Sequence, residues 1–200
     1  TLDVRAVEPG NALEIRQLAA ARKALAQLAS QPGVPALDYK LVLLPQKEPN
    51  AFAFPGGTIG LTRGMLDVAD SEIALAFVLA HELGHFAQRD RLRGLGRTLG
   101  RGLAWAIIFG DAGDTLSQHA GTLLDLAHSR QQEAGADGFG RRLVHGIYGK
   151  TEGSERIFVW LDQHRRSPAW GRWLQSHPDA GDRVDRLRAE AKKLGSGGGK

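Results

Sequence analysis

Apolar residues occupy every side of the helix that the sequence predicts over 71–89, which is the pattern of a helix running through the middle of a fold. Ser71 can cap its N-terminus, and Arg89 suits the negative end of the helix dipole. A second helix is expected over 9–30, where leucines recur with helical spacing until Pro32 ends the pattern. The pattern therefore predicts two helices, of which the one at 71–89 is buried.

Three short runs rich in aliphatic and aromatic residues lie between these helices and predict strands at 39–44, 51–54 and 58–62. Pro55, Gly56 and Gly57 make the turn between the last two. After residue 71 the chain is mainly helical, with a break near 94–102, a long helix through Glu133 and Asp137, and a final helix over 179–194. Strands followed by helices predict an α+β fold, with a small sheet over the buried helix.

Composition favours one compact domain. The 200 residues are 42% hydrophobic, which allows a sizeable core, and no internal repeat or interior linker divides residues 1–194. Residues 195–200 form a flexible Gly/Ser tail. The longest apolar run, 103–109, is far shorter than the roughly 20 residues that span a bilayer, so we expect no transmembrane segment in this chain. The absence of cysteine excludes disulfides and thiolate metal ligands.

Two histidines and a glutamate interrupt the buried helix. His81 and His85 are four residues apart and share one helical face, so both imidazoles can bind one ion. Neutral imidazole is a preferred zinc ligand, and Glu82 beside the ion can take a proton from metal-activated water. The motif predicts a zinc hydrolase site. The alternative is a pair of hydrogen-bonded core histidines with an incidental glutamate.

A catalytic zinc needs a third protein ligand, and a candidate lies downstream. Glu133 and Asp137 are again four residues apart, and the residues between them are small, which lets two helices approach closely. Gly84 gives the same allowance on the first helix. Glu133 could then reach the ion, and Asp137 could accept a hydrogen bond from a ligand imidazole. The alternative for this pair is a solvated helix face.

Four sequence blocks together resemble the M48 family of zinc metallopeptidases. They are His-Glu-Leu-Gly-His at 81–85, Ser-Arg-x-x-Glu-x-x-Ala-Asp at 129–137, Asn-Ala-Phe-Ala-Phe-Pro-Gly-Gly at 50–57, and Ser-His-Pro at 176–178 with Arg183 and Leu187. The blocks span roughly residues 50–190 in the family's order. The resemblance implies a zincin-like fold of the gluzincin type, in the minimal soluble form found in bacteria.

The resemblance also implies roles for individual residues around one zinc ion per chain. Glu82 would be the general base and acid, and Asp137 would be either a hydrogen-bond partner of a ligand or a proton donor. His177, in its family-like setting, is expected to stabilise the oxyanion or to cap the open zinc position. A structural turn before Pro178 is the alternative for His177. The implied metal ligands are His81, His85 and Glu133.

In the fold that the resemblance implies, an extended peptide commonly pairs with an exposed strand edge above the zinc. Main-chain pairing gives affinity with little side-chain selectivity, which suits a protease acting on unfolded segments. A buried hairpin without substrate contact is the alternative. The candidate edge strand consists of Asn50, Ala51, Phe52, Ala53 and Phe54.

The function that we predict is a zinc-dependent endopeptidase acting on peptides or unfolded proteins in protein quality control. The alternative is a catalytically silent, zinc-containing binding or chaperone module of the same fold. The net charge of +4 raises nucleic acid or an anionic membrane as partners, but no nucleic-acid motif is present. The basic stretch 89–101 either makes a peripheral membrane contact or, as we favour, is a solvated face. We expect a bacterial cell envelope or periplasmic location, with an anchor upstream of Thr1 as one option.

Overall fold

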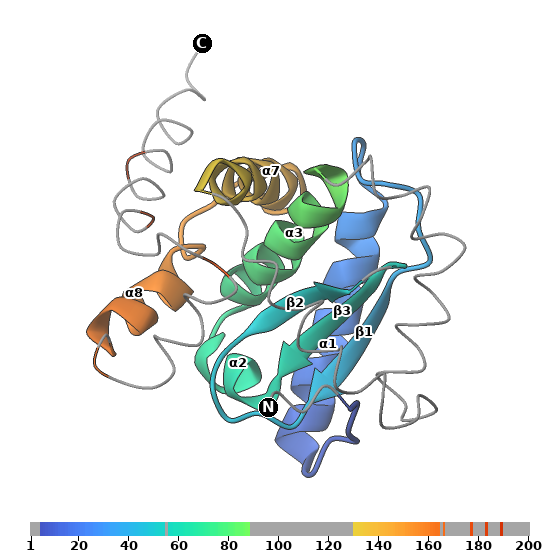
Figure 1. The fold of residues 1–200 in the computed structure, drawn as a ribbon, viewed down its shortest axis with the longest axis vertical. Helices are drawn as coiled ribbons and strands as arrows, with labels where there is room; N and C mark the ends of the chain where they lie inside the picture. The colour runs from blue at the N-terminus through green and yellow to red at the C-terminus, as the bar shows by residue number, and fades with distance from the viewer. Residues whose placement is uncertain are drawn as a thin grey trace.

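The structure, a computed structural model, describes residues 5–54, 56–88, 130–164, 166, 177, 183 and 189 (Figure 1). It is a mixed α/β fold of helices and a small three-stranded sheet, and the predicted α+β class is confirmed. The elements in chain order are α1 (Ala12–Ala29), β1 (Lys40–Leu44), β2 (Ala51–Phe54), β3 (Thr58–Thr62), α2 (Arg63–Val68), α3 (Glu72–Gln88), α7 (Arg130–Tyr148) and α8 (Arg156–Gln163).

The sheet has the order β1-β3-β2, with β1 parallel and β2 antiparallel to the central strand β3. All three strands occur where the sequence predicts them, and β1 begins one residue late. The turn between β2 and β3 requires glycine, because Gly56 and Gly57 have φ of 88° and 97°. A Cβ on Gly57 would also lie 3.0 Å from the carbonyl oxygen of Asp38. This arrangement leaves β2 at an edge of the sheet.

Helix α1 begins later than predicted because the side chain of Asn11 caps it, accepting from the backbone N–H of Glu14 at 2.9 Å. Helix α2 was not predicted. It is only six residues long, and its N-cap is Thr62, whose hydroxyl accepts from the backbone N–H of Met65 at 3.1 Å. The buried side of α1 packs on α3 and β1, and consists of Leu18, Ala21, Ala24, Leu25 and Leu28.

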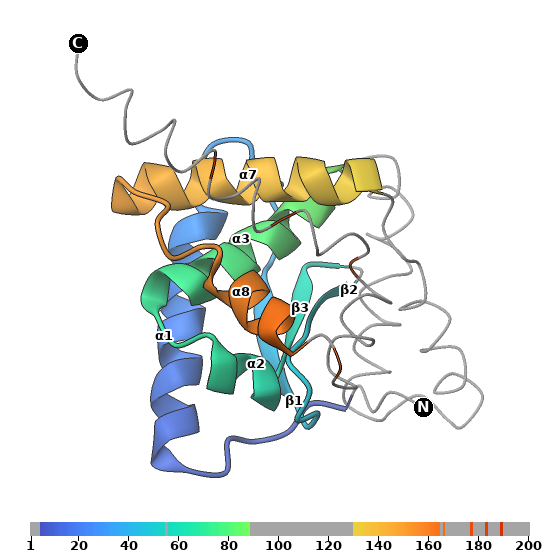
Figure 2. The ribbon, with the colours of Figure 1, turned by 90° about the vertical axis from the view of Figure 1, so that its left-hand side faces the viewer.

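Helix α3 is the central element, as predicted from its apolar sequence. Ser71 caps it, its hydroxyl accepting from the backbone N–H of Ala74 at 3.2 Å. Thirteen of its residues, from Ala74 to Phe86, are buried. Figures 1 and 2 show α3 enclosed by α1, α7 and the sheet. The side chains that this helix presents toward α7 are therefore inside the protein.

Several predictions lie outside the described residues. These are the break at 94–102, the basic stretch 89–101, the apolar run 103–109, the tail 195–200 and, apart from the helical residues Arg183 and Ala189, the final helix at 179–194. The single-domain division at 1–194 stays a prediction. Among the helices of the described ranges, none combines the length and the hydrophobicity of a membrane span.

Candidate metal centre

Small residues close the seam between α3 and α7. A Cβ added at Gly84 would lie 2.8 Å from the Cα of Ala136, and one at Gly140 would lie 3.1 Å from the backbone nitrogen of His81. The two helices therefore approach backbone to backbone, closer than larger side chains would allow. This approach brings Glu133, in the first turn of α7, to the face of α3 that carries the histidines.

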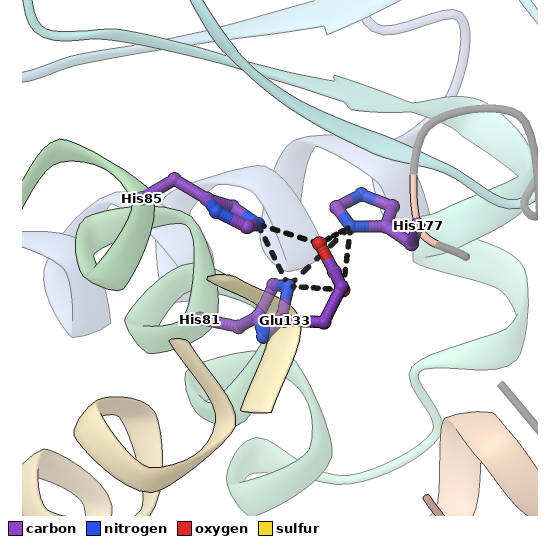
Figure 3. Close-up of side chains that lie close together, drawn as sticks. All are labelled: His81, His85, Glu133 and His177. Atoms are coloured by element: carbon purple, nitrogen blue, oxygen red, sulfur yellow. Dashed lines mark hydrogen bonds and ion pairs between the residues drawn. The ribbon is translucent and has the colours of Figure 1, made fainter. Parts of the chain in front are cut away.

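Four buried side chains point toward one another at this seam (Figure 3). Nε2 of His81 lies 3.0 Å from Nε2 of His85 and 3.4 Å from Oε2 of Glu133. Oε1 of the same carboxylate lies 3.4 Å from Nε2 of His85. Nδ1 of His177 lies 3.4 Å from Nε2 of His81 and 3.3 Å from Oε2 of Glu133. The structure thus brings the three predicted ligands together and adds His177 to them.

This donor set fits a zinc ion in type and spacing. Zinc binds imidazole nitrogen and carboxylate oxygen at about 2.0–2.2 Å, so donors at the corners of a tetrahedron lie about 3.3–3.6 Å apart. The contacts that join His81 to the other three side chains span 3.0–3.4 Å. Nitrogen and oxygen lone pairs turned toward one centre repel each other unless a cation or a proton lies between them.

The charges around the centre fit a divalent cation as well. Three carboxylates are buried here, those of Glu82, Glu133 and Asp137. One guanidinium, that of Arg183, is buried against the last two. A divalent cation would supply two further positive charges to a centre in which buried carboxylates outnumber the guanidinium.

The surroundings of His81 also favour positive charge. Its Nδ1 lies 3.0 Å from Oδ1 of Asp137, so a proton on Nδ1 is donated there and Nε2 is left directed at the centre. Burial, the largest influence, and the charge of Arg183 lower the pKa of His81, but hydrogen bonds to Asp137 and Glu133 outweigh them and raise it to about 9. A cation at Nε2 would satisfy the same carboxylates in place of the proton.

The two carboxylates of α7 are held in their ionised form. Burial is the largest influence on the pKa of Glu133 and raises it, yet hydrogen bonds with His177 and His81 bring this pKa well below its usual range. Burial also raises the pKa of Asp137, and the charge of Arg183 with the hydrogen bond to His81 lowers it overall. Glu133 can therefore act as an anionic ligand, and Asp137 as an acceptor for a ligand imidazole.

His177 lies between the other donors, Glu82 and the edge of the sheet. While its Nδ1 faces the donors, its Nε2 lies 3.4 Å from the carbonyl oxygen of Ala51 and 3.6 Å from Oε1 of Glu82. Glu82 is buried and follows His81 directly on α3. The imidazole of His177 thus contacts the predicted base, the other donors and the first residue of β2.

The predicted edge strand lies beside this imidazole. The carbonyl oxygen of Asn50 accepts from the backbone N–H of Thr62 at 3.1 Å, so the polar groups of Ala51, the next residue, point away from β3. The N–H of Ala51 donates to Oδ1 of Asn50 at 2.9 Å, and its carbonyl oxygen faces His177. The rest of the strand consists of Phe52 and Phe54, both buried, and the half-buried Ala53.

Comparison with known proteins agrees with the motifs. The family model described as Peptidase family M48 matches residues 14–191, which is most of the chain. The chain belongs to peptidase family M48. The family resemblance of the sequence is confirmed, and the protein is a metallopeptidase.

Relatives of this M48 peptidase carry protease names. A "Protease HtpX homolog" of Pyrococcus abyssi is 28% identical over 84% of this chain and 72% of that protein. The human "Metalloendopeptidase OMA1, mitochondrial" is 28% identical over 82% of this chain but only 35% of its own length. A "Putative beta-barrel assembly-enhancing protease" of Vibrio cholerae is 30% identical over 72% of this chain and 33% of that protein. The chain therefore spans about a third of the length of the last two.

The structure also places Arg183 in the centre, where the sequence assigned it no role. Its Nε donates to Oδ2 of Asp137 at 2.9 Å and its Nη2 to Oδ1 at 2.5 Å. Its Nη1 donates to Oε2 of Glu133 at 2.9 Å. The centre of the Phe158 ring on α8 lies 4.2 Å from the guanidinium carbon. The sequence signal was a single arginine in the M48-like C-terminal block, which does not reveal these partners.

Proposed function

We propose that this M48 peptidase is a zinc-dependent endopeptidase with one zinc ion per chain. The observation that supports it best is the buried group of His81, His85, Glu133 and His177 beside Glu82. The donors are nitrogen and oxygen at zinc-like separations, and a carboxylate capable of taking a proton lies next to them. In this proposal His81, His85 and Glu133 are the permanent ligands.

The roles of the side chains follow from their contacts. When bound, zinc polarises the scissile carbonyl and lowers the pKa of water. Glu82 accepts the proton of the attacking water and delivers it to the leaving amine. Asp137 accepts from Nδ1 of His81 and so keeps Nε2 of that ring free for the ion, which favours a positioning role over that of a proton donor.

For His177 we propose the capping role, in which Nδ1 takes the fourth position around the ion in the resting protein. A ring whose Nε2–H donates to the carbonyl oxygen of Ala51 has its lone pair on Nδ1, the atom that faces the donors. Oxyanion stabilisation would instead require an N–H at that position. Replacement His177→Ala should leave the metal bound and preserve or raise peptide hydrolysis; a lower kcat with metal retained would support the oxyanion role.

We propose that the substrate enters as an extended strand along β2, and that His177 must leave for it to do so. The carbonyl oxygen of Ala51, which His177 faces, is one of the main-chain groups that an added strand would need. Departure of His177 would free this carbonyl and the fourth metal position together. Side-chain selectivity is then expected to be low, which suits unfolded protein as substrate.

The alternative is a silent module that keeps the ion and His177 in place permanently. The buried position of His177 is compatible with it, and turnover of peptide separates the two possibilities. The protease names of the relatives support the enzyme. The similarity to a "Putative beta-barrel assembly-enhancing protease" supports a quality-control role in a bacterial cell envelope.

The replacement Glu82→Gln tests the assignment. Glutamine keeps the shape of the side chain but cannot accept the proton, so hydrolysis of an unfolded protein should fall by about 10²–10⁴-fold. Elemental analysis should find the metal retained. Glu72→Gln, the same change at the start of α3, is the matched control and should remain active. Retention of more than about a tenth of the activity in Glu82→Gln, a loss below that range, would contradict the proposal.

A further inference from the structure

The guanidinium of Arg183 is held in one orientation. Two of its nitrogens form a fork on the carboxylate of Asp137, at 2.9 and 2.5 Å, and its carbon lies 4.2 Å from the ring centre of Phe158. Arg183 and Glu133 both have an exposed fraction of 0%. Bulk water therefore does not compete for their contact.

This orientation makes the two oxygens of Glu133 unequal. Oε2 accepts from Nη1 of Arg183 at 2.9 Å. Both oxygens face the other donors: Oε2 lies 3.4 Å from Nε2 of His81 and 3.3 Å from Nδ1 of His177, and Oε1 lies 3.4 Å from Nε2 of His85 and 3.4 Å from Nδ1 of His177. The difference between them is the hydrogen bond from Arg183, which Oε2 accepts. A carboxylate oxygen that accepts a charge-assisted hydrogen bond has less electron density to give to a metal.

We propose that Arg183 is a positioning residue that holds Oε2 of Glu133 and leaves Oε1 as the oxygen that binds the ion. This inference rests on the proposed zinc site. Without Arg183 both oxygens of Glu133 are able to turn to the ion, and the second oxygen would occupy a further coordination position. A single oxygen ligand keeps that position for water or substrate, as a catalytic zinc site requires.

A double-mutant cycle on the full chain, with Co²⁺ alone as the probe, tests the role of Arg183. In the otherwise unmodified chain, Arg183→Met should weaken Co²⁺ binding by about 10–100-fold. In the Glu133→Gln background the effect should vanish or reverse. An amide has one acceptor oxygen, and Arg183 attracts it and turns the NH₂ group toward the ion. Removing Arg183 then frees that oxygen for Co²⁺.

The visible absorption of bound Co²⁺ gives a second readout that does not depend on activity. Four-coordinate Co²⁺ absorbs more strongly than Co²⁺ of higher coordination, so Arg183→Met should weaken the bands. Arg183→Lys should restore part of the intensity, because an ammonium group can also donate to Oε2. Arg156→Met, which removes an exposed arginine of α8, is the control and should have the natural spectrum.

The proposal is overturned if Arg183→Met weakens Co²⁺ binding equally in both backgrounds and leaves the bands unchanged, since Arg183 would then only pack. If circular dichroism finds Arg183→Met unfolded, Arg183→Lys is tested instead, together with Asp137→Asn in one double variant. Co²⁺ affinity and absorption bands equal to those of the unmodified chain in this double variant would overturn the proposal. Failure of the unmodified chain to bind Co²⁺ would instead overturn the zinc site itself.

Discussion

The two sides of α3 are buried against neighbours that differ in charge. On one side α1 contributes Leu18, Leu25 and Leu28 to an aliphatic contact. On the other side α7 contributes Leu143 and Val144 to the same core, but it also buries Glu133 and Asp137. These two carboxylates lie against histidines of α3 and against Arg183. Both contacts exclude water, but a buried carboxylate, unlike a buried apolar side chain, gains no free energy simply by being buried.

The difference separates stability from function within one helix. Buried apolar surface stabilises by about 25 cal/mol per Å², whatever is bound elsewhere. Buried carboxylates cost free energy unless they are paired, and their pairing here depends on Arg183 and on a cation among the donors. The α1 side is therefore expected to be stable by itself, whereas the α7 side should depend on its ligands.

The largest effect should come from Glu133→Ala. It removes a proposed ligand and leaves Arg183 with one carboxylate fewer, and breaking a buried pair typically costs about 3–5 kcal/mol. Activity should fall by more than about 100-fold, beyond the usual loss for a residue that merely supports a ligand. Metal content should fall as well. Elemental analysis measures the metal, calorimetry the stability and a peptide assay the activity. Gln132→Ala, one residue earlier on α7, is the control; a full metal content in Glu133→Ala would mean that another residue is the ligand.

On the other side of α3, Leu28→Ala should destabilise the fold and spare the chemistry. Leu28 is 0% exposed, and truncating such a leucine costs about 2–5 kcal/mol. The melting temperature should fall, by roughly 2–4 °C for each kcal/mol in a domain of this size. Metal content and kcat/KM measured well below the transition should stay natural. A loss of metal in Leu28→Ala would show that the two sides of α3 are coupled.

Metal removal should affect the α7 side in a way that depends on pH. A ligand that binds only the folded state stabilises it by about 4 kcal/mol at a thousandfold excess over Kd. In the metal-free protein the pKa of His81 is raised from 6.5 to about 9, so its contribution to stability is complete below the unfolded value and lost as pH rises through about 9. Metal binding has the opposite dependence, because the ligand imidazoles must be neutral.

The melting temperatures of the metal-loaded and chelated proteins should therefore separate as pH rises from near 6.5 to 9. The His81 shift alone corresponds to about 3 kcal/mol across this window. Calorimetry with and without chelator, at several pH values, measures the separation. A constant difference would mean that proton and cation do not compete at His81.

The sequence predicted what depends on short-range patterns. The strands, α1 and α3 followed from periodicity and capping residues, and the shared face of His81 and His85 followed from their spacing on one helix. Helix α2 was missed because six residues are too few for a periodic pattern. The partners of Arg183 are 46 and 50 residues away in the chain, and no local rule relates such positions. The sequence could not decide between the roles considered for His177 for the same reason, since its contact at Ala51 is 126 residues away.

The smallest effect should come from a contact that belongs to neither side of the comparison. Arg156 of α8 pairs with Asp70 at 2.5 Å, but their side chains are 53% and 50% exposed. Exposed ion pairs contribute about 0–1 kcal/mol, because water and salt screen them and two long side chains lose freedom. Arg156→Gln should therefore change the melting temperature by no more than roughly 2–4 °C, and less at high salt. Natural metal content and turnover are expected, and calorimetry at low and high ionic strength checks the salt effect. A loss of metal in this variant would mean that metal binding depends on α8 as well as on the contact between α3 and α7. Phe158 of α8, which packs on Arg183, would be the connection.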